Sequence, residues 1–130
     1  FYFKRTGPKN IGKDFNCKNT NYDLDLYYSK INNTVQEFNK IIEENQYKEI
    51  YLWPASIHSL YLINFGLNVD SITGFLDNST IKIGNKMYGT NLNVFDFKEK
   101  VESDNAIILV NGGVFNKEVE HQLKKSGKKF

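Results

Sequence analysis

The stretch EIYLWPASIHSLYLINFG, residues 49–66, joins a short strand-like run to a helical run through a sharp turn. Residues 49–53 are mostly aliphatic and aromatic, as is typical of a strand. From Ser56 onward, apolar residues recur at spacings of three and four, as on one side of a helix, and Gly66 fits the position just past the helix end. The stretch therefore predicts the start of a βαβ unit of the nucleotide-binding type, with its turn at residues 53–56.

The rest of the chain continues the alternation of strands and helices. Strands are expected at 71–76, near 91–94 and at 106–110, and helices at 96–101 and 114–125. The run 106–110 is apolar without interruption, which is typical of a parallel strand buried on both faces. This order predicts an α/β fold, a Rossmann-like parallel sheet with flanking helices and right-handed crossovers.

A long amphipathic helix is expected at residues 23–45, ahead of the first strand. Its apolar positions recur at helical spacing, at Leu24, Tyr28, Ile31, Val35, Phe38 and Ile42. We expect this stripe to pack on the domain, with a homodimer through helix 23–45 as the alternative. The expected organisation is an irregular segment, 1–20, that ends an upstream domain, followed by a Rossmann-like C-terminal domain at 21–130.

Composition excludes several classes of protein. The chain has 130 residues, a formal net charge of +2 and a single cysteine, Cys17. The charge gives no indication of binding to nucleic acid or a membrane, and no disulfide can form within one chain. The cytoplasm is therefore the expected location. Of the 17 basic residues only Arg5 is arginine, so bidentate phosphate clamps are scarce. The ends of the chain are expected to be cut from a longer protein.

Three segments are expected at the carboxyl edge of the sheet, where open α/β sheets bind ligands. They are residues 54–59, 77–78 and 111–113. The helix that begins at the turn favours an anion, and an acidic residue about 20 positions later suits a ribose hydroxyl. The candidate substrate-binding residues are Ala55, Ser56, His58, Ser59, Asp77, Asn78 and Gly112.

The turn lacks the glycines of a dinucleotide-binding fingerprint. Pro54, Ile57 and Ser59 stand where glycines would allow a pyrophosphate to approach the backbone. A tight NAD or FAD site is therefore excluded from the expectations. We assign no catalytic residue and no metal ligand, because the context of His58 and His121 indicates no catalytic triad.

Several segments together resemble a known family. They are LWPASIHS at 52–59, GFLDN at 74–78, KIG at 82–84, GT at 89–90 and the apolar run 107–110. This pattern is similar to the C-terminal domain of sugar C-methyltransferases, which methylate nucleotide-linked deoxysugars. The resemblance implies a domain that holds or orients a nucleotide-sugar substrate in bacterial glycan biosynthesis. S-adenosylmethionine and the catalytic groups would then belong to an upstream domain, and this chain alone would be inactive.

Two alternatives stay open. The same segments resemble the N-terminal domain of nucleotide-sugar acyltransferases, whose turn matches at Ala55, Ser56 and His58. The other alternative is a non-catalytic packing or oligomerisation module. In that module Trp53, Pro54 and Ile57 would fill a silenced nucleotide site, and the stripe on helix 23–45 would contact a partner.

Overall fold

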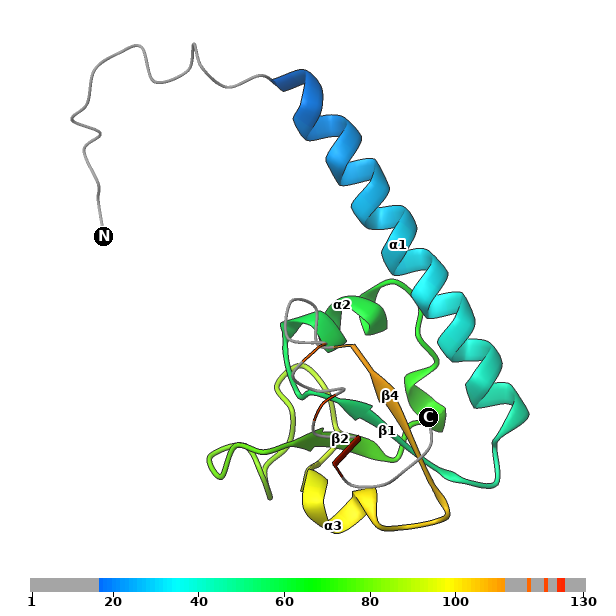
Figure 1. Cartoon of the computed structure of the whole chain (residues 1–130), viewed down its shortest axis with the longest axis vertical. Helices are drawn as coiled ribbons and strands as arrows, with labels where there is room; N and C mark the ends of the chain where they lie inside the picture. The colour runs from blue at the N-terminus through cyan, green and yellow to red at the C-terminus, as the bar shows by residue number, and fades with distance from the viewer. Residues whose placement is uncertain (1–16, 112–116, 118–120, 122–123, 126–130) are drawn as a thin grey trace, which may run out of the picture. The chain divides into compact units, whose positions relative to one another are not determined.

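A computed structural model describes residues 17–111 and four positions beyond them, Lys117, His121, Lys124 and Lys125 (Figure 1). The first element is the helix α1 (Cys17–Glu44). The chain divides within α1 into two compact units, residues 1–30 and 31–130, and the sheet lies entirely in the second.

Seven further elements follow α1 along the described chain. They are β1 (Glu49–Trp53), α2 (Ile57–Asn64), the 3-10 turn η1 (Val69–Ser71), β2 (Gly74–Asp77), β3 (Val94–Asp96), α3 (Phe97–Val101) and β4 (Ala106–Val110). No helix in the part of the chain that the structure describes is long and apolar enough to cross a membrane.

The four strands form one parallel sheet in the order β3-β2-β1-β4. The chain runs outward from β1 through α2 to β2 and then β3, and α3 carries it back to β4 on the other side of β1. Strand order therefore reverses between β1 and β4. This is the arrangement of one half of a Rossmann sheet, and it confirms the predicted α/β class.

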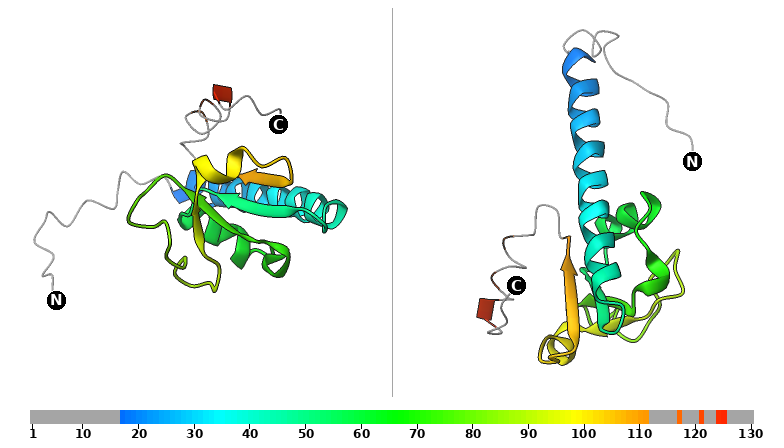
Figure 2. Two further views of the ribbon diagram at one scale, coloured as in Figure 1. Left: turned by 90° about the horizontal axis from the view of Figure 1, so that it is seen from below. Right: turned by 90° about the vertical axis from the view of Figure 1, so that its right-hand side faces the viewer.

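Helices cover both faces of this sheet. On one face, Val35 and Ile42 of α1 and Leu62 of α2 pack in one buried cluster with Ile50 and Leu52 of β1. On the other face, the α3 residues Phe97 and Val101 cluster with Tyr51, Trp53 and Leu76. Figure 2 shows α2 and α3 on opposite sides of the strands. The split follows from right-handed crossovers that run in opposite directions along the sheet.

The predicted packing of the long helix on the domain is confirmed for its second half. Val35 and Ile42 lie in the core, and Ile31 and Phe38 pack against it. The helix begins at Cys17, several residues before the expected start at 23, so residues 17–20 are not irregular. Extending a helix that has already nucleated adds one hydrogen bond for each residue ordered, which favours such an extension.

The helix α2 ends as predicted at Gly66. Its φ of 101° is a left-handed conformation that glycine adopts without a steric penalty. The amide of Gly66 donates to the carbonyl of Ile63, and the amide of Leu67 donates to that of Leu62. These two bonds are the pair that defines a Schellman motif.

The bounds of β2 and β3 differ from the prediction. The expected strand 71–76 begins only at Gly74, and the strand expected near 91–94 lies at Val94–Asp96. Gly74 sits against β3, because a Cβ there would lie 2.8 Å from the Asn93 carbonyl oxygen. Close approach of β3 therefore decides where β2 begins. The bounds of β1 and β4 agree with the prediction. The predicted burial of β4 on both faces is wrong, because β4 lies at the edge of the described sheet and Leu109 is its one buried residue.

The segment between β2 and β3 folds back along β3. Gly84, with φ of 83°, makes the predicted turn, and its amide donates to the carbonyl of Val94. Lys86 and Asn93 form an isolated antiparallel bridge, and Met87 is buried in the core. The expected helix 114–125 lies largely outside the described residues, although Lys117, His121, Lys124 and Lys125 are helical.

Ile42→Ala is expected to lower the free energy of unfolding by about 2–5 kcal/mol, because it leaves a cavity in a core where Ile42 is fully buried. The matched control is Ile81→Ala, since Ile81 is 84% exposed and should change the value by less than about 0.5 kcal/mol. Urea denaturation followed by circular dichroism measures both. Equal losses in the two variants would contradict the packing of α1 on the sheet.

Candidate functional site

The carboxyl ends of all four strands lie at one edge of the sheet, because the strands are parallel. The predicted segments meet there. The amide of Ala55 donates to the carbonyl of Leu76 at 3.0 Å, and the amide of Asn111 donates to that of Trp53 at 2.8 Å. The structure thus brings together the ends of β1, β2 and β4. Gly112, the last predicted residue, lies outside the described residues.

The turn between β1 and α2 is closed by its own side chains. The Trp53–Pro54 peptide bond is cis. Ser59 is fully buried, and its hydroxyl donates to the carbonyl of Pro54 at 2.6 Å. Ser59 therefore holds the turn, and its predicted contact with a ligand stays a prediction.

Ser56 is the N-cap residue of α2 but makes no side-chain capping bond. Its Oγ atom is buried and has no hydrogen-bond partner among the described residues. Ser56 therefore takes the N-cap position in the backbone without capping the helix through its side chain. The main-chain carbonyl of Ser56 accepts the amide of Leu60 at 3.2 Å.

The Asp77 carboxylate, predicted to read a ribose, is engaged within the chain. Its Oδ1 accepts the amide of Ser79 at 2.9 Å, and its Oδ2 pairs with Lys82 Nζ at 3.0 Å. Lys82 Nζ also donates to the carbonyl of Ala55 at 2.8 Å. Asp77 therefore acts as a turn cap and ion-pair partner, and Lys82 ties the segment after β2 to the turn after β1.

The reversal point between β1 and β4 is bridged as well. The Asn111 side-chain amide donates to the carbonyl of His58 at 3.2 Å, which links the end of β4 to the first turn of α2. The His58 ring is partly buried and meets the Tyr61 ring edge to face, with centroids 6.4 Å apart. This bridge occupies the place where an open crevice is expected in doubly wound sheets.

Trp53 packs beneath α3 and does not fill the turn. Its ring stacks on that of Phe97 at 4.0 Å between centroids and 19° between planes. Ile57 is 50% exposed, so it does not plug the turn either. The proposed filling of a silenced site by Trp53 and Ile57 is therefore not what the side chains do.

Beside this stack, burial raises the pKa of the Tyr51 phenol above its usual value, and the Glu49 carboxylate raises it further. The phenol donates to Glu49 Oε2 at 3.2 Å, while the nearby Lys100 ammonium opposes the shift. Tyr51 is thus held neutral and anchors α3 on the sheet. It is a structural group rather than a member of the carboxyl-edge site.

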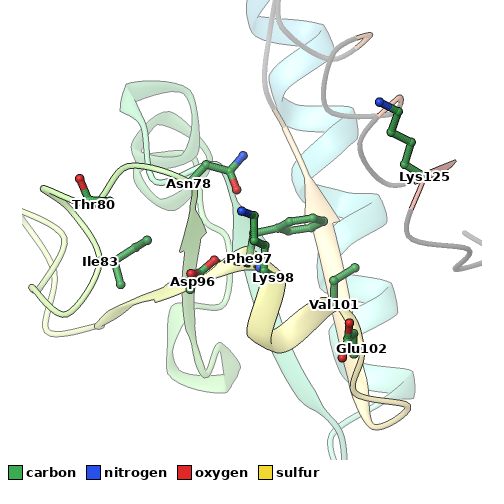
Figure 3. Close-up of a pocket in the computed structure, with 9 residues that line it drawn as sticks. All are labelled: Asn78, Thr80, Ile83, Asp96, Phe97, Lys98, Val101, Glu102 and Lys125. Atoms are coloured by element: carbon green, nitrogen blue, oxygen red, sulfur yellow. Dashed lines mark hydrogen bonds between the residues drawn. The ribbon is translucent and has the colours of Figure 1, made fainter.

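A groove of about 700 Å³ opens at the same edge, between the segment after β2 and α3 (Figure 3). Polar and charged side chains line it together with apolar ones, of which Phe97 and Val101 are buried. The lining residues are Asn78, Thr80, Ile83, Asp96, Phe97, Lys98, Val101, Glu102 and Lys125. Among the predicted site residues that the structure describes, Asn78 alone lines this groove.

Asp96 and Lys98 are the groove residues that the sequence analysis missed. The strand β3 ends at Asp96, at the same edge as the other strands, and the Asp96 carboxylate caps α3 by accepting the amide of Lys98 at 2.9 Å. A carboxylate at an expected strand-to-helix boundary was the available signal. In the part of the chain that is described, no group of three or more His, Cys, Asp or Glu side chains is arranged to hold a metal ion.

Ser56→Ala is expected to leave stability unchanged or raise it by about 1 kcal/mol, because it removes a buried hydroxyl that lacks a partner. An ordinary N-cap serine would instead lose about 1 kcal/mol. Thermal unfolding of this variant beside Ser59→Ala provides the measurement. Ser59→Ala should destabilise, since it leaves the Pro54 carbonyl unpaired. A clear loss in Ser56→Ala would contradict the orphaned hydroxyl.

Comparison of the chain with protein-family models, with curated proteins and with solved structures finds no match.

Proposed function

We propose that this chain is the substrate-handling domain of an enzyme that acts on a nucleotide-linked sugar, with methyl transfer carried out by another part of that enzyme. The observation that carries the proposal is an open groove of about 700 Å³ at the carboxyl edge of a sheet with Rossmann strand order. Ligands of open parallel sheets bind at that edge, and ligand pockets occupy about 300–1,000 Å³. The resemblance of roughly residues 20–130 to the C-terminal domain of sugar C-methyltransferases supports the same substrate class.

The proposed role is to bind and orient the substrate. S-adenosylmethionine is assigned to the other part of the enzyme, because the turn at 54–59 does not fit a cofactor that lies against the backbone. Pro54 has no amide to offer, and the amide of Ala55 already donates to Leu76. No catalytic residue is assigned to this chain.

Calorimetric titration with dTDP-glucose and UDP-glucose is expected to show saturable binding, with glucose and inorganic phosphate as controls that give no comparable heat. The expected affinity is modest, because the internal bonds of Asp77, Ser59 and Asn111 leave few polar groups free to contact a ligand. Absence of binding by this chain, and also by any longer protein in which it occurs, would contradict the proposal.

A partner-contact module is the second candidate, and exposed apolar residues on α1 favour it. Leu24 and Tyr28 are each 45% exposed, whereas Val35 and Ile42 of the same stripe are buried in the domain. A contact with a partner through the apolar stripe of α1 is therefore proposed only for the first half of this helix. Phe38 packs against the core, so a change there would disturb folding as well as any contact.

Under this second candidate, light scattering is expected to give twice the monomer mass, and Leu24→Asp is expected to restore the monomer by placing a charge on the exposed stripe. Asn32→Asp is the matched control, because it adds the same charge to an exposed polar position of α1. A strictly monomeric wild-type chain, or equal dissociation by both variants, would argue against a dimer through α1.

A further inference from the structure

We propose that the groove beside α3, and not the turn at 54–59, binds the sugar-phosphate part of the ligand. In this site the Asp96 carboxylate accepts hydrogen bonds from sugar hydroxyls and the Lys98 ammonium contacts the phosphate. The identity of the ligand rests on the proposed function. The position of the site rests on the contacts, lining residues and charges of the described part of the chain.

At the turn after β1 and at the reversal point, where ligands of open parallel sheets usually bind, the protein's own groups bond to one another. At the reversal point between β1 and β4, the Asn111 side chain bridges to the carbonyl of His58. At the turn, Ser59 closes on Pro54, and Lys82 covers the carbonyl of Ala55. A ligand would have to break these bonds to enter, and each broken bond would leave a polar group unpaired.

Two Asp–Lys pairs at this edge differ in their contacts. Asp77 and Lys82 neutralise each other at 3.0 Å. Asp96 and Lys98 do not form an ion pair among the described residues. Instead Asp96 uses Oδ1 to accept the backbone amide of Lys98, and its Oδ2 has no partner in the described part of the chain. Within the described part of the chain, one acceptor and one ammonium at the groove thus have no partner in each other.

The lining of the groove includes apolar side chains. Phe97 and Val101 line the groove, and the stack with Trp53 holds Phe97 in place. Aromatic and aliphatic side chains beside polar ones match a sugar ring, which has apolar C–H faces and hydroxyls at its edge. Pockets of this kind use a few placed polar groups to set orientation.

Charged side chains of both signs line the groove. Two carboxylates and two ammonium groups line the groove, those of Asp96, Glu102, Lys98 and Lys125. The mixture suits a ligand that carries both hydroxyls and phosphate, since carboxylates accept from hydroxyls while lysine donates to phosphate oxygens. A ligand made only of phosphate would meet carboxylate repulsion in the same space.

Titration of the ¹⁵N-labelled intact chain, followed by two-dimensional NMR, tests the site. The probes are UDP-glucose, glucose 1-phosphate and UDP. UDP-glucose and glucose 1-phosphate are expected to shift the amides of Asn78, Thr80 and Phe97 together, and UDP is expected to shift them less. Asp96→Asn and Lys98→Gln are each expected to weaken UDP-glucose binding at least fivefold.

The variants are chosen to keep the fold. Asparagine is as good an N-cap as aspartate, and Lys98 is exposed. Lys40→Gln is the matched control, because Lys40 is an exposed lysine of α1, which packs on the other face of the sheet, and its affinity should equal that of the wild type.

Three outcomes would overturn the inference. Binding of UDP-glucose with shifts confined to residues 56–59 and 111 would move the site to the turn and leave the proposed function standing. Unchanged affinity for UDP-glucose in both Asp96→Asn and Lys98→Gln would overturn the position of the site and would also leave the proposed function standing. Absence of binding by all three probes at millimolar concentration would overturn the inference together with the proposed function.

Discussion

The parallel pairing of β1 on both of its edges is the constraint on which the rest of the structure depends. β1 pairs with β2 on one side and with β4, through all five of its residues, on the other. Because β1 is central, its alternate residues must be apolar on both faces, and Ile50 to Trp53 are all buried. The same pairing brings the turn after β1 next to the ends of β2 and β4, and so creates the edge that a ligand can reach.

The way this edge satisfies its own polar groups distinguishes the molecule from an open nucleotide-binding sheet. Glycines normally let a pyrophosphate take up the free amides of the turn. In this chain Ser59, Lys82 and Asn111 donate to the carbonyls of Pro54, Ala55 and His58. These side chains thus tie the turn after β1 to the ends of β2 and β4. The groove beside α3 lies one strand further out, at the end of β3.

The site was only partly predictable from the sequence. The convergence of residues 54–59, 77–78 and 111 follows from strand order alone, and it is confirmed. The partners of Ser59 and Asp77 could not be predicted from residue type, and the contacts of these two residues with a ligand stay predictions. Asp96 and Lys98 were not among the predicted site residues, because their place beside the groove depends on how α3 packs after β3. No local pattern records that property.

The sequence by itself determined the β1-turn-α2 unit, the stop at Gly66, the bounds of β4 and the apolar stripe of α1, because these depend on short-range periodicity and turn chemistry. Only the tertiary structure decided where β2 and β3 begin and which polar groups bond to one another. Those features depend on contacts between residues far apart in the chain, such as Lys82 with Ala55 and Asn111 with His58, 27 and 53 positions apart. Folding must bring such partners together before either has a defined role.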